Sequence, residues 1–133
     1  MPSRLGRLRS AAEFERVKRE GGYWRGRLCA VNAAMRTSLG AATEDERVAG
    51  PARVGYIASR KIGTAVQRNR ARRLLRESIR LLAGRLLPEW DIVLIARRDL
   101  CSSGVRMRDV QDELIWLLTR ARIVIPSETH NQA

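Results

Sequence analysis

The sequence predicts an α+β protein whose helices pack on one small sheet, in the order helix, strands, helix, strand, helix. Two capping boxes support this prediction, because S-A-A-E at Ser10 and T-A-V-Q at Thr64 each precede a helix-patterned segment. The apolar run 91–96 is typical of a strand that is buried on both faces. A strand–helix–strand unit is therefore expected over roughly 53–96.

The first half of the chain is expected to hold one helix and two long extended segments. Residues 1–9 are basic and polar and are expected to form a loose arm. The first helix should run from its capping box to about Glu20, where Gly21-Gly22 ends it. Residues 23–36 have an extended pattern, 37–51 form a polar and locally acidic loop, and 53–59 form a second long strand.

The second half supplies the other two helices and the tail. The second helix should run to about Leu82 and bury one apolar arc. The third helix follows a loop at 99–104 and has Trp116 on its flank. Its core stripe consists of Val110, Leu114, Leu117, Leu118 and Ala121. With 133 residues, the chain suits a single domain over 1–133 that ends in a disordered tail at about 124–133.

Arginine dominates the second helix. Six of the thirteen residues from Arg68 to Arg80 are arginines, and Glu77 is the only acid in that run. Arg72, Arg76 and Arg80 form one ridge at i, i+4 spacing, where like charges repel one another. A fold that tolerates this repulsion is expected to present the ridge to a polyanion. The alternative interpretation of the same arginines is a helix face that only contacts solvent.

The composition favours a nucleic-acid partner. Lys and Arg number 26 against 14 Asp and Glu, which gives a net charge of +12, while the hydrophobic content of 44% is that of a folded domain. A membrane surface is the competing anion. However, no stretch approaches the length that spans a bilayer, and no N-terminal signal pattern is present. We expect a cytoplasmic protein that does not contact a membrane.

The chain shows no residue set for hydrolysing RNA by itself. Cys29 and Cys101 are far apart and His130 stands alone in the tail, so no zinc constellation is visible. A nuclease would need clustered carboxylates for Mg²⁺ or a general base. Two candidate acids, Glu44 and Asp45, lie in the 37–51 loop. The others, Asp109, Asp112 and Glu113, are expected on an exposed helix flank. The protein is therefore predicted to be a binder.

Residues 55–77 carry a long string of fixed spacings. G-Y-I-A-S-R-K-I-G-T-A-V-Q-R-N-R-A-R-R-L-L-R-E resembles the signature of the bacterial ribonuclease P protein subunit, S-[KR]-K-x-G-x-A-V-x-R-N-R-x-[KR]-R-x-x-R-E. With its flanks, the resemblance covers about residues 4 to 122. It implies a small two-layer α/β sandwich of order α-β-β-β-α-β-α, similar to ribosomal protein S5 domain 2. It also implies a left-handed βαβ crossover, where general rules would favour a right-handed one.

The resemblance also implies a function. Proteins of this family partner a catalytic RNA in ribonuclease P, which removes the 5′ leader from precursor tRNA. The RNA performs the hydrolysis with Mg²⁺ that it mainly binds itself, so no catalytic residue is expected in the protein. One protein is expected per RNA. The alternative function is a structural RNA-binding protein of ribosomal type, and a protein-only metal nuclease is disfavoured by the missing acid cluster.

The resemblance and the arginine ridge together give two sets of site residues. The RNA-subunit-binding set is Arg68, Asn69, Arg70, Arg72, Arg73, Arg76 and Arg80. The leader-binding set is Phe14, Lys18, Asn32, Arg60, Lys61 and Arg97. Phe14 suits either stacking on a leader base or a core position. Lys18 and Asn32 stand where the family commonly has aromatic residues, and Thr64 stands where asparagine is frequent beside a proposed metal-binding region. The groove is therefore expected to be more polar than usual.

Overall fold

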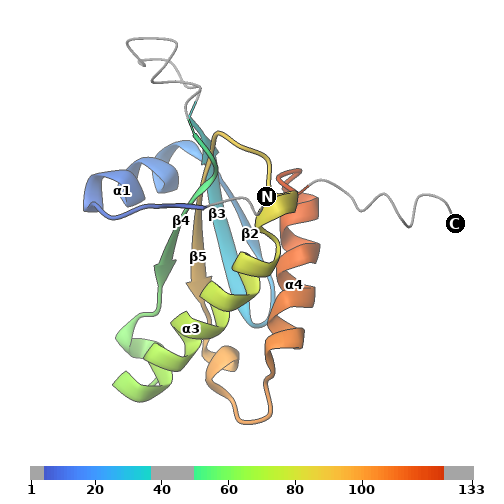
Figure 1. Ribbon diagram of the computed structural model, residues 1–133. Helices are drawn as coiled ribbons and strands as arrows, with labels where there is room; N and C mark the ends of the chain where they lie inside the picture. The colour runs from blue at the N-terminus through green and yellow to red at the C-terminus, as the bar shows by residue number, and fades with distance from the viewer. Residues whose placement is uncertain (1–4, 37–49, 125–133) are drawn as a thin grey trace, which may run out of the picture.

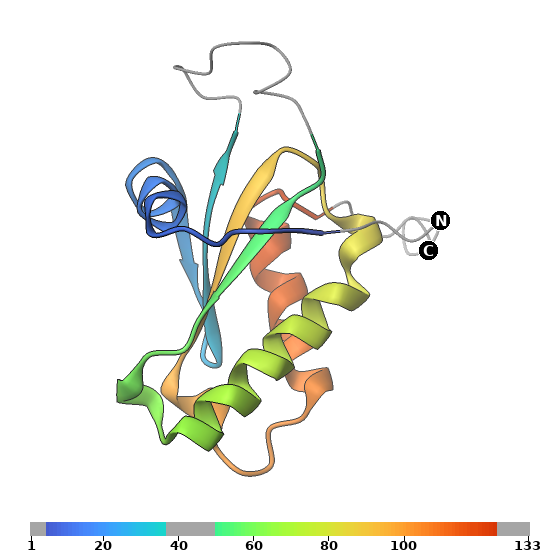
Figure 2. The same cartoon turned by 60° about the vertical axis from the view of Figure 1, so that its left-hand side comes forward.

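The computed structural model describes residues 5–36 and 50–124, which form a five-stranded sheet with helices on both faces (Figure 1). The strand order is β1-β4-β5-β3-β2. Helix α1 packs on one face, and helices α3 and α4 pack on the other (Figure 2). The predicted α+β sandwich is confirmed, and the structure adds that α1 lies opposite the other two helices.

The element bounds follow the predicted order closely. The strands are β1 (Gly6–Arg7), β2 (Gly22–Arg25), β3 (Cys29–Met35), β4 (Arg53–Ile57) and β5 (Trp90–Ala96). The helices are α1 (Ala11–Glu20), α3 (Ala65–Leu81) and α4 (Met107–Arg120). Both predicted capping boxes are present, because the hydroxyls of Ser10 and Thr64 each accept a hydrogen bond from the third helical N–H.

The sheet is built around β5. Strand β4 is parallel to β5 and is joined to it through α3, which confirms the strand–helix–strand unit, while the hand of this crossover stays a prediction. On its other side, β5 pairs antiparallel with β3, and β3 pairs antiparallel with β2. The extended segment 23–36 is therefore a hairpin of two strands.

Alternation along β5 divides the core between the two faces. Ile92 and Leu94 belong to the large cluster under α3 and α4, whereas Val93 belongs to a small cluster under α1. The predicted stripe of α4 is buried in the large cluster, and Trp116 is exposed on its flank, as expected. The small cluster leaves part of the α1 face of the sheet uncovered.

The predicted loose arm is wrong for its last residues. Gly6 and Arg7 form β1, which pairs in parallel with Arg53 and Val54 of β4. Leu8 is buried in the small cluster, with an exposed fraction of 3%. A single buried leucine in a basic segment gives no periodic signal, so the sequence pattern did not reveal it. At the other end, Val124 is buried. The rest of the predicted arm, tail and loop (1–4, 125–133 and 37–49) lies outside the described residues.

A buried carboxylate at the start of β5 ties α1 to the sheet. Asp91 has no exposed surface, and it accepts hydrogen bonds from Arg53 of β4 and from Arg36 at the end of β3, each at 2.8 Å. It also accepts a hydrogen bond from Arg16 of α1. A buried charge requires such partners, because it would be strongly destabilising without them.

The arginines also determine the ionisation of Asp91. Burial by itself raises the pKa of this carboxyl, but the hydrogen bonds from Arg53 and Arg36 outweigh that effect and hold the pKa below its usual value. A carboxyl whose pKa is lower in the folded state stabilises the fold above its unfolded-state pKa. This stabilisation is lost as the pH falls through the folded-state pKa.

We predict that Asp91→Asn lowers the free energy of unfolding by about 3 kcal/mol at neutral pH, because it leaves three arginines without their shared carboxylate. Urea denaturation across a pH series measures this. The difference between the two proteins should begin to shrink as the pH falls below about 4, where the carboxyl of the unfolded chain becomes protonated. It should vanish as the pH falls through the lower folded-state pKa of Asp91. The control is Asp99→Asn, because Asp99 is half-exposed and stands 3.9 Å from Arg27, so its loss should cost under about 0.5 kcal/mol. Equal effects of the two variants would contradict the role of Asp91.

Candidate nucleic-acid interface

Helix α3 presents its arginines on the side that faces away from the core. Ala71, Leu75, Ser78 and Ile79 are buried against the sheet and α4, and this fixes the rotation of the helix about its axis. Of the predicted RNA-subunit-binding residues, Asn69, Arg73, Arg76 and Arg80 are exposed. Arg68, Arg70 and Arg72 are half-buried. The ridge predicted from the helical period is therefore present, with its start partly enclosed.

The half-buried arginines have different surroundings. Arg68 donates to the carbonyl oxygen of Gly63 at 3.2 Å and Arg70 to that of Val105 at 3.0 Å, so both also connect α3 to neighbouring loops. The Nη1 atom of Arg72 is buried and has no hydrogen-bond partner among the described residues. Two donors thus have a structural partner, and one buried donor has none.

The exposed arginines are not equivalent either. Arg80 forms a 2.7 Å ion pair with Glu77 on the same helix. The guanidinium of Arg76 lies 5.7 Å from the centre of the Tyr56 ring, within the range of a cation–π contact. No ion pair is seen for Arg73 in the part of the chain that the structure describes. Arg73, which lies beside the ridge, is thus the most freely available of the exposed arginines on α3.

A groove lies between α1 and the uncovered part of the sheet. It is a hollow of about 320 Å³ whose lining includes three predicted leader-binding residues, Phe14, Lys18 and Asn32. Tyr23 of β2 and Ile57 of β4 stand in the same lining. The structure therefore brings these three predicted residues together and adds an aromatic residue that the sequence analysis missed.

Phe14 has both of the roles considered for it. It packs against the small cluster under α1, and it also lines the groove. Its ring lies over Gly55 of the signature segment, where a Cβ atom would stand only 2.4 Å from the ring. Glycine at position 55 is therefore required for the ring to approach β4 this closely.

Tyr23 and Asn32 are opposite each other in the β2–β3 ladder. Tyr23 is 57% exposed, so its ring is available to a ligand. Asn32 is buried, and its side-chain amide donates to the carbonyl oxygens of Gly22 at 2.7 Å and Val17 at 3.4 Å. Asn32 thus connects the end of α1 to the hairpin. Only the hairpin register, which places Tyr23 directly opposite Asn32, could have identified Tyr23 as a residue of the groove.

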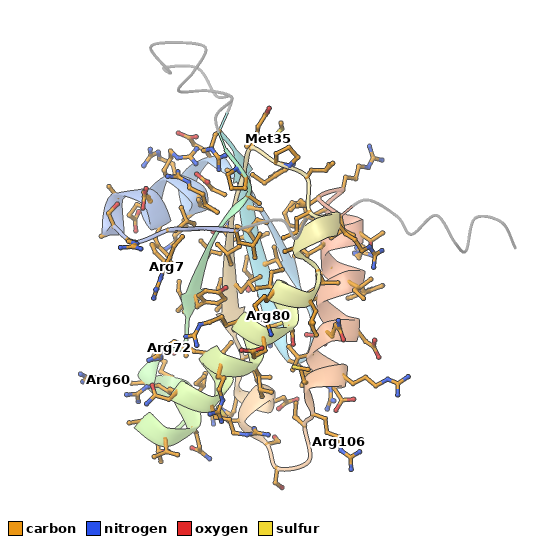
Figure 3. All side chains as sticks on the ribbon, in the orientation of Figure 1. Arg7, Met35, Arg60, Arg72, Arg80 and Arg106 are labelled. Atoms are coloured by element: carbon orange, nitrogen blue, oxygen red, sulfur yellow. The ribbon has the colours of Figure 1, made fainter. Side chains whose placement is uncertain are left out.

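The other three predicted leader-binding residues do not line this groove. Arg60 and Lys61 are exposed in a 3₁₀ turn after β4. Arg97 follows β5 and donates to the carbonyl oxygen of Gly26 at 2.8 Å, so it supports the β2–β3 turn. Arg60 lies at the far end of α3 from Arg80 (Figure 3). These residues extend the basic surface beyond the groove.

Glu113 is not on an exposed helix flank, which corrects that expectation. Its carboxylate accepts hydrogen bonds from the N–H groups of Arg27, Leu28 and Cys29 at 2.8–3.1 Å. This contact attaches the β2–β3 turn to α4. Cys29 lies next to this carboxylate. Burial, and to a lesser extent the charge of Glu113, raises the pKa of its thiol, so this cysteine stays protonated.

Two further features bear on the predicted functions. Within residues 5–36 and 50–124, no three His, Cys, Asp or Glu side chains are grouped so that they could hold a metal ion. None of the helices in those ranges is long and apolar enough to cross a membrane.

A basic helix beside a groove on a small α/β fold is typical of nucleic-acid-binding proteins. The model of the Ribonuclease P family matches residues 2–122. The ribonuclease P protein component of Roseiflexus castenholzii is 36% identical over 121 residues, which is 91% of this chain and 89% of that protein. That of Dehalococcoides mccartyi is 39% identical over 118 residues, covering 89% and 86%. The RNase P protein from Thermotoga maritima has a TM-score of 0.70 at 28% identity, covering 86% of this chain and 96% of that one. The chain belongs to the Ribonuclease P family.

Proposed function

We propose that this chain is the protein subunit of a cytoplasmic ribonuclease P, with one protein per RNA. It binds the catalytic RNA through the arginine ridge of α3 and the 5′ leader of precursor tRNA in the groove beside α1. The RNA carries the chemistry with Mg²⁺ that is bound mainly by the RNA itself. The observation that carries the proposal is the joint placement of Phe14, Lys18 and Tyr23 around a hollow next to a helix of exposed arginines.

The chemistry of the two surfaces suits different parts of RNA. Guanidinium groups bind phosphates with paired hydrogen bonds, which suits a folded RNA whose backbone is outermost. The groove offers aromatic faces and one lysine, which suits a single strand whose bases are unstacked. A precursor tRNA leader is such a strand, whereas the body of the tRNA is folded.

The first test is cleavage of precursor tRNA. We expect the purified chain alone to leave precursor tRNA intact in Mg²⁺, and to accelerate leader removal when a bacterial ribonuclease P RNA is added. Mapping of the product 5′ end measures the site of cutting. Cleavage by RNA-free protein, or preferential binding to ribosomal RNA without any effect on the ribonuclease P RNA, would contradict the proposal.

The second test concerns the arginine-rich face of α3, where Arg73 lies beside the ridge. Arg73→Gln should reduce the salt dependence of binding to the RNA subunit, because each lost phosphate contact lowers the log–log slope by about 0.7–0.9. The control is Arg108→Gln, which removes the same charge from an exposed position on α4. Binding titrations between low and moderate salt measure both slopes. If the two variants change the slope equally, this face of α3 does not make a specific contact with the RNA subunit.

The third test concerns the groove. Tyr23→Ala should reduce the preference for leader-bearing over leaderless tRNA by about 1 kcal/mol or more, which is the cost of one lost base stack. Tyr23→Phe should retain the preference. The matched control is Trp116→Ala on α4, because Trp116 is similarly exposed at 53%. Lys18→Phe should make the preference less dependent on salt. If the leader preference is unchanged in Tyr23→Ala and Lys18→Phe at every salt concentration, the leader does not bind in this groove.

A further inference from the structure

A second hollow opens beside the groove, where β1 and β4 meet α3. It measures about 480 Å³, and its lining includes Arg7, Arg9, Arg72 and Arg76. No acidic residue lines it, and no ion pair involves these four arginines within the described residues. Arg7 and Arg72 lie on the same side of the molecule (Figure 3). Four cations around one hollow repel one another unless an anion lies between them.

Arg72 contributes an unpaired hydrogen-bond donor to this hollow. Its Nη1 atom is buried, yet it has no hydrogen-bond partner among the residues that the structure describes. Buried donors are nearly always paired, and an unpaired charged donor is destabilising. Arg68 and Arg70, on the same helix, both donate to a carbonyl oxygen. Arg72 instead lines the hollow, where an anionic oxygen would satisfy the donor.

Tyr56 adds an uncharged donor to the same lining. Burial raises the pKa of its hydroxyl, although the charges of Arg76 and Arg7 act in the opposite direction, so the hydroxyl keeps its proton at neutral pH. The pairing of β1 with β4 ends at Arg7 and Val54, and the N–H of Leu8 makes the last bond to β4. Beyond that point the outer edge of β4 has no strand partner within the described ranges, so the hollow opens at Tyr56.

Phe14 connects this hollow to the groove, because it lines both of them. A nucleotide whose base lies on the groove side of Phe14 would place its backbone on the arginine side. We propose that the arginine-lined hollow binds a backbone phosphodiester of the single-stranded RNA whose base occupies the groove. This proposal rests on the proposed function where it names the tRNA leader as the bound strand. The lining of the hollow by itself favours a phosphate group, whichever RNA carries it.

The consequence is a division of labour along α3. With this proposal, Arg72 and Arg76 move from the RNA-subunit-binding set to the leader strand, which they hold together with Arg7 and Arg9 from the segment before α1. Arg73 and Arg80 are exposed and remain available to the RNA subunit. A phosphate of the RNA subunit is the other source of the same chemical group, and the experiments below distinguish the two.

The first experiment uses the free protein and a five-nucleotide single-stranded RNA, in parallel with inorganic phosphate followed by ³¹P NMR. Arg72→Gln should weaken binding of the oligonucleotide by about tenfold or more, because it removes charge-assisted hydrogen bonds to one phosphate. Arg7→Gln should also weaken binding of the oligonucleotide. Because Arg7 is exposed, this variant tests the hollow even if Arg72→Gln disturbs folding. Arg108→Gln is the charge-matched control. The proposal is overturned if Arg72→Gln and Arg7→Gln weaken binding no more than this control.

The second experiment identifies the source of the phosphate in the reconstituted holoenzyme. A series of precursor tRNAs carries one neutral methylphosphonate at successive leader positions. At one position the methylphosphonate and Arg72→Gln should have non-additive effects, because both remove the same contact. If every position is additive while Arg72→Gln weakens binding of the RNA subunit, the phosphate belongs to that RNA and the proposal is wrong. If Tyr23→Ala still reduces leader preference in that case, the groove assignment stands without the phosphate site.

Discussion

The shape of this protein depends on one buried carboxylate. Asp91 lies at the start of the central strand and is the shared partner of Arg16 on α1, Arg36 after β3 and Arg53 on β4. These three arginines come from elements on both sides of β5, and only one of them lies on a helix. The small apolar cluster under α1 offers little surface for attachment. The ion-pair network therefore fixes where α1 sits, and the position of α1 defines one wall of the groove.

The second wall is fixed by contacts of a different kind. The β2–β3 turn is attached to α4 through Glu113 and to the end of β5 through Arg97. Asn32 then ties this hairpin to the carboxyl end of α1. Each of these contacts joins a charged or amide side chain to backbone groups, so the hairpin cannot shift without leaving buried polar groups unpaired. The groove is thus held open by polar contacts at both ends, while apolar packing supports its floor.

Local patterns in the sequence predicted most of the fold, because capping boxes, the apolar run of β5 and the stripe of α4 act within a few residues. The helical period also located the ridge of α3, whereas the three residues of the groove, Phe14, Lys18 and Asn32, came from the family resemblance. The misses were non-local. Leu8 and β1 are ordered only because β4 has a free edge, and Glu113 is enclosed only because the β2–β3 turn lies on α4. Tyr23 joins Phe14 only through the hairpin register. None of these pairings leaves a periodic signal in the chain.

The distribution of partners explains why arginine, and not lysine, dominates this basic protein. Several arginines use one part of the guanidinium for an internal contact, as Arg70 and Arg97 do with carbonyl oxygens. A guanidinium has five donors in a rigid plane, so an internal bond leaves other donors directed outward, whereas a lysine has one mobile ammonium group. Such arginines can order a loop and still face a phosphate. Four arginines and no acidic residue line the hollow between β1 and α3, whereas the arginines around Asp91 share its carboxylate and hold α1 in place.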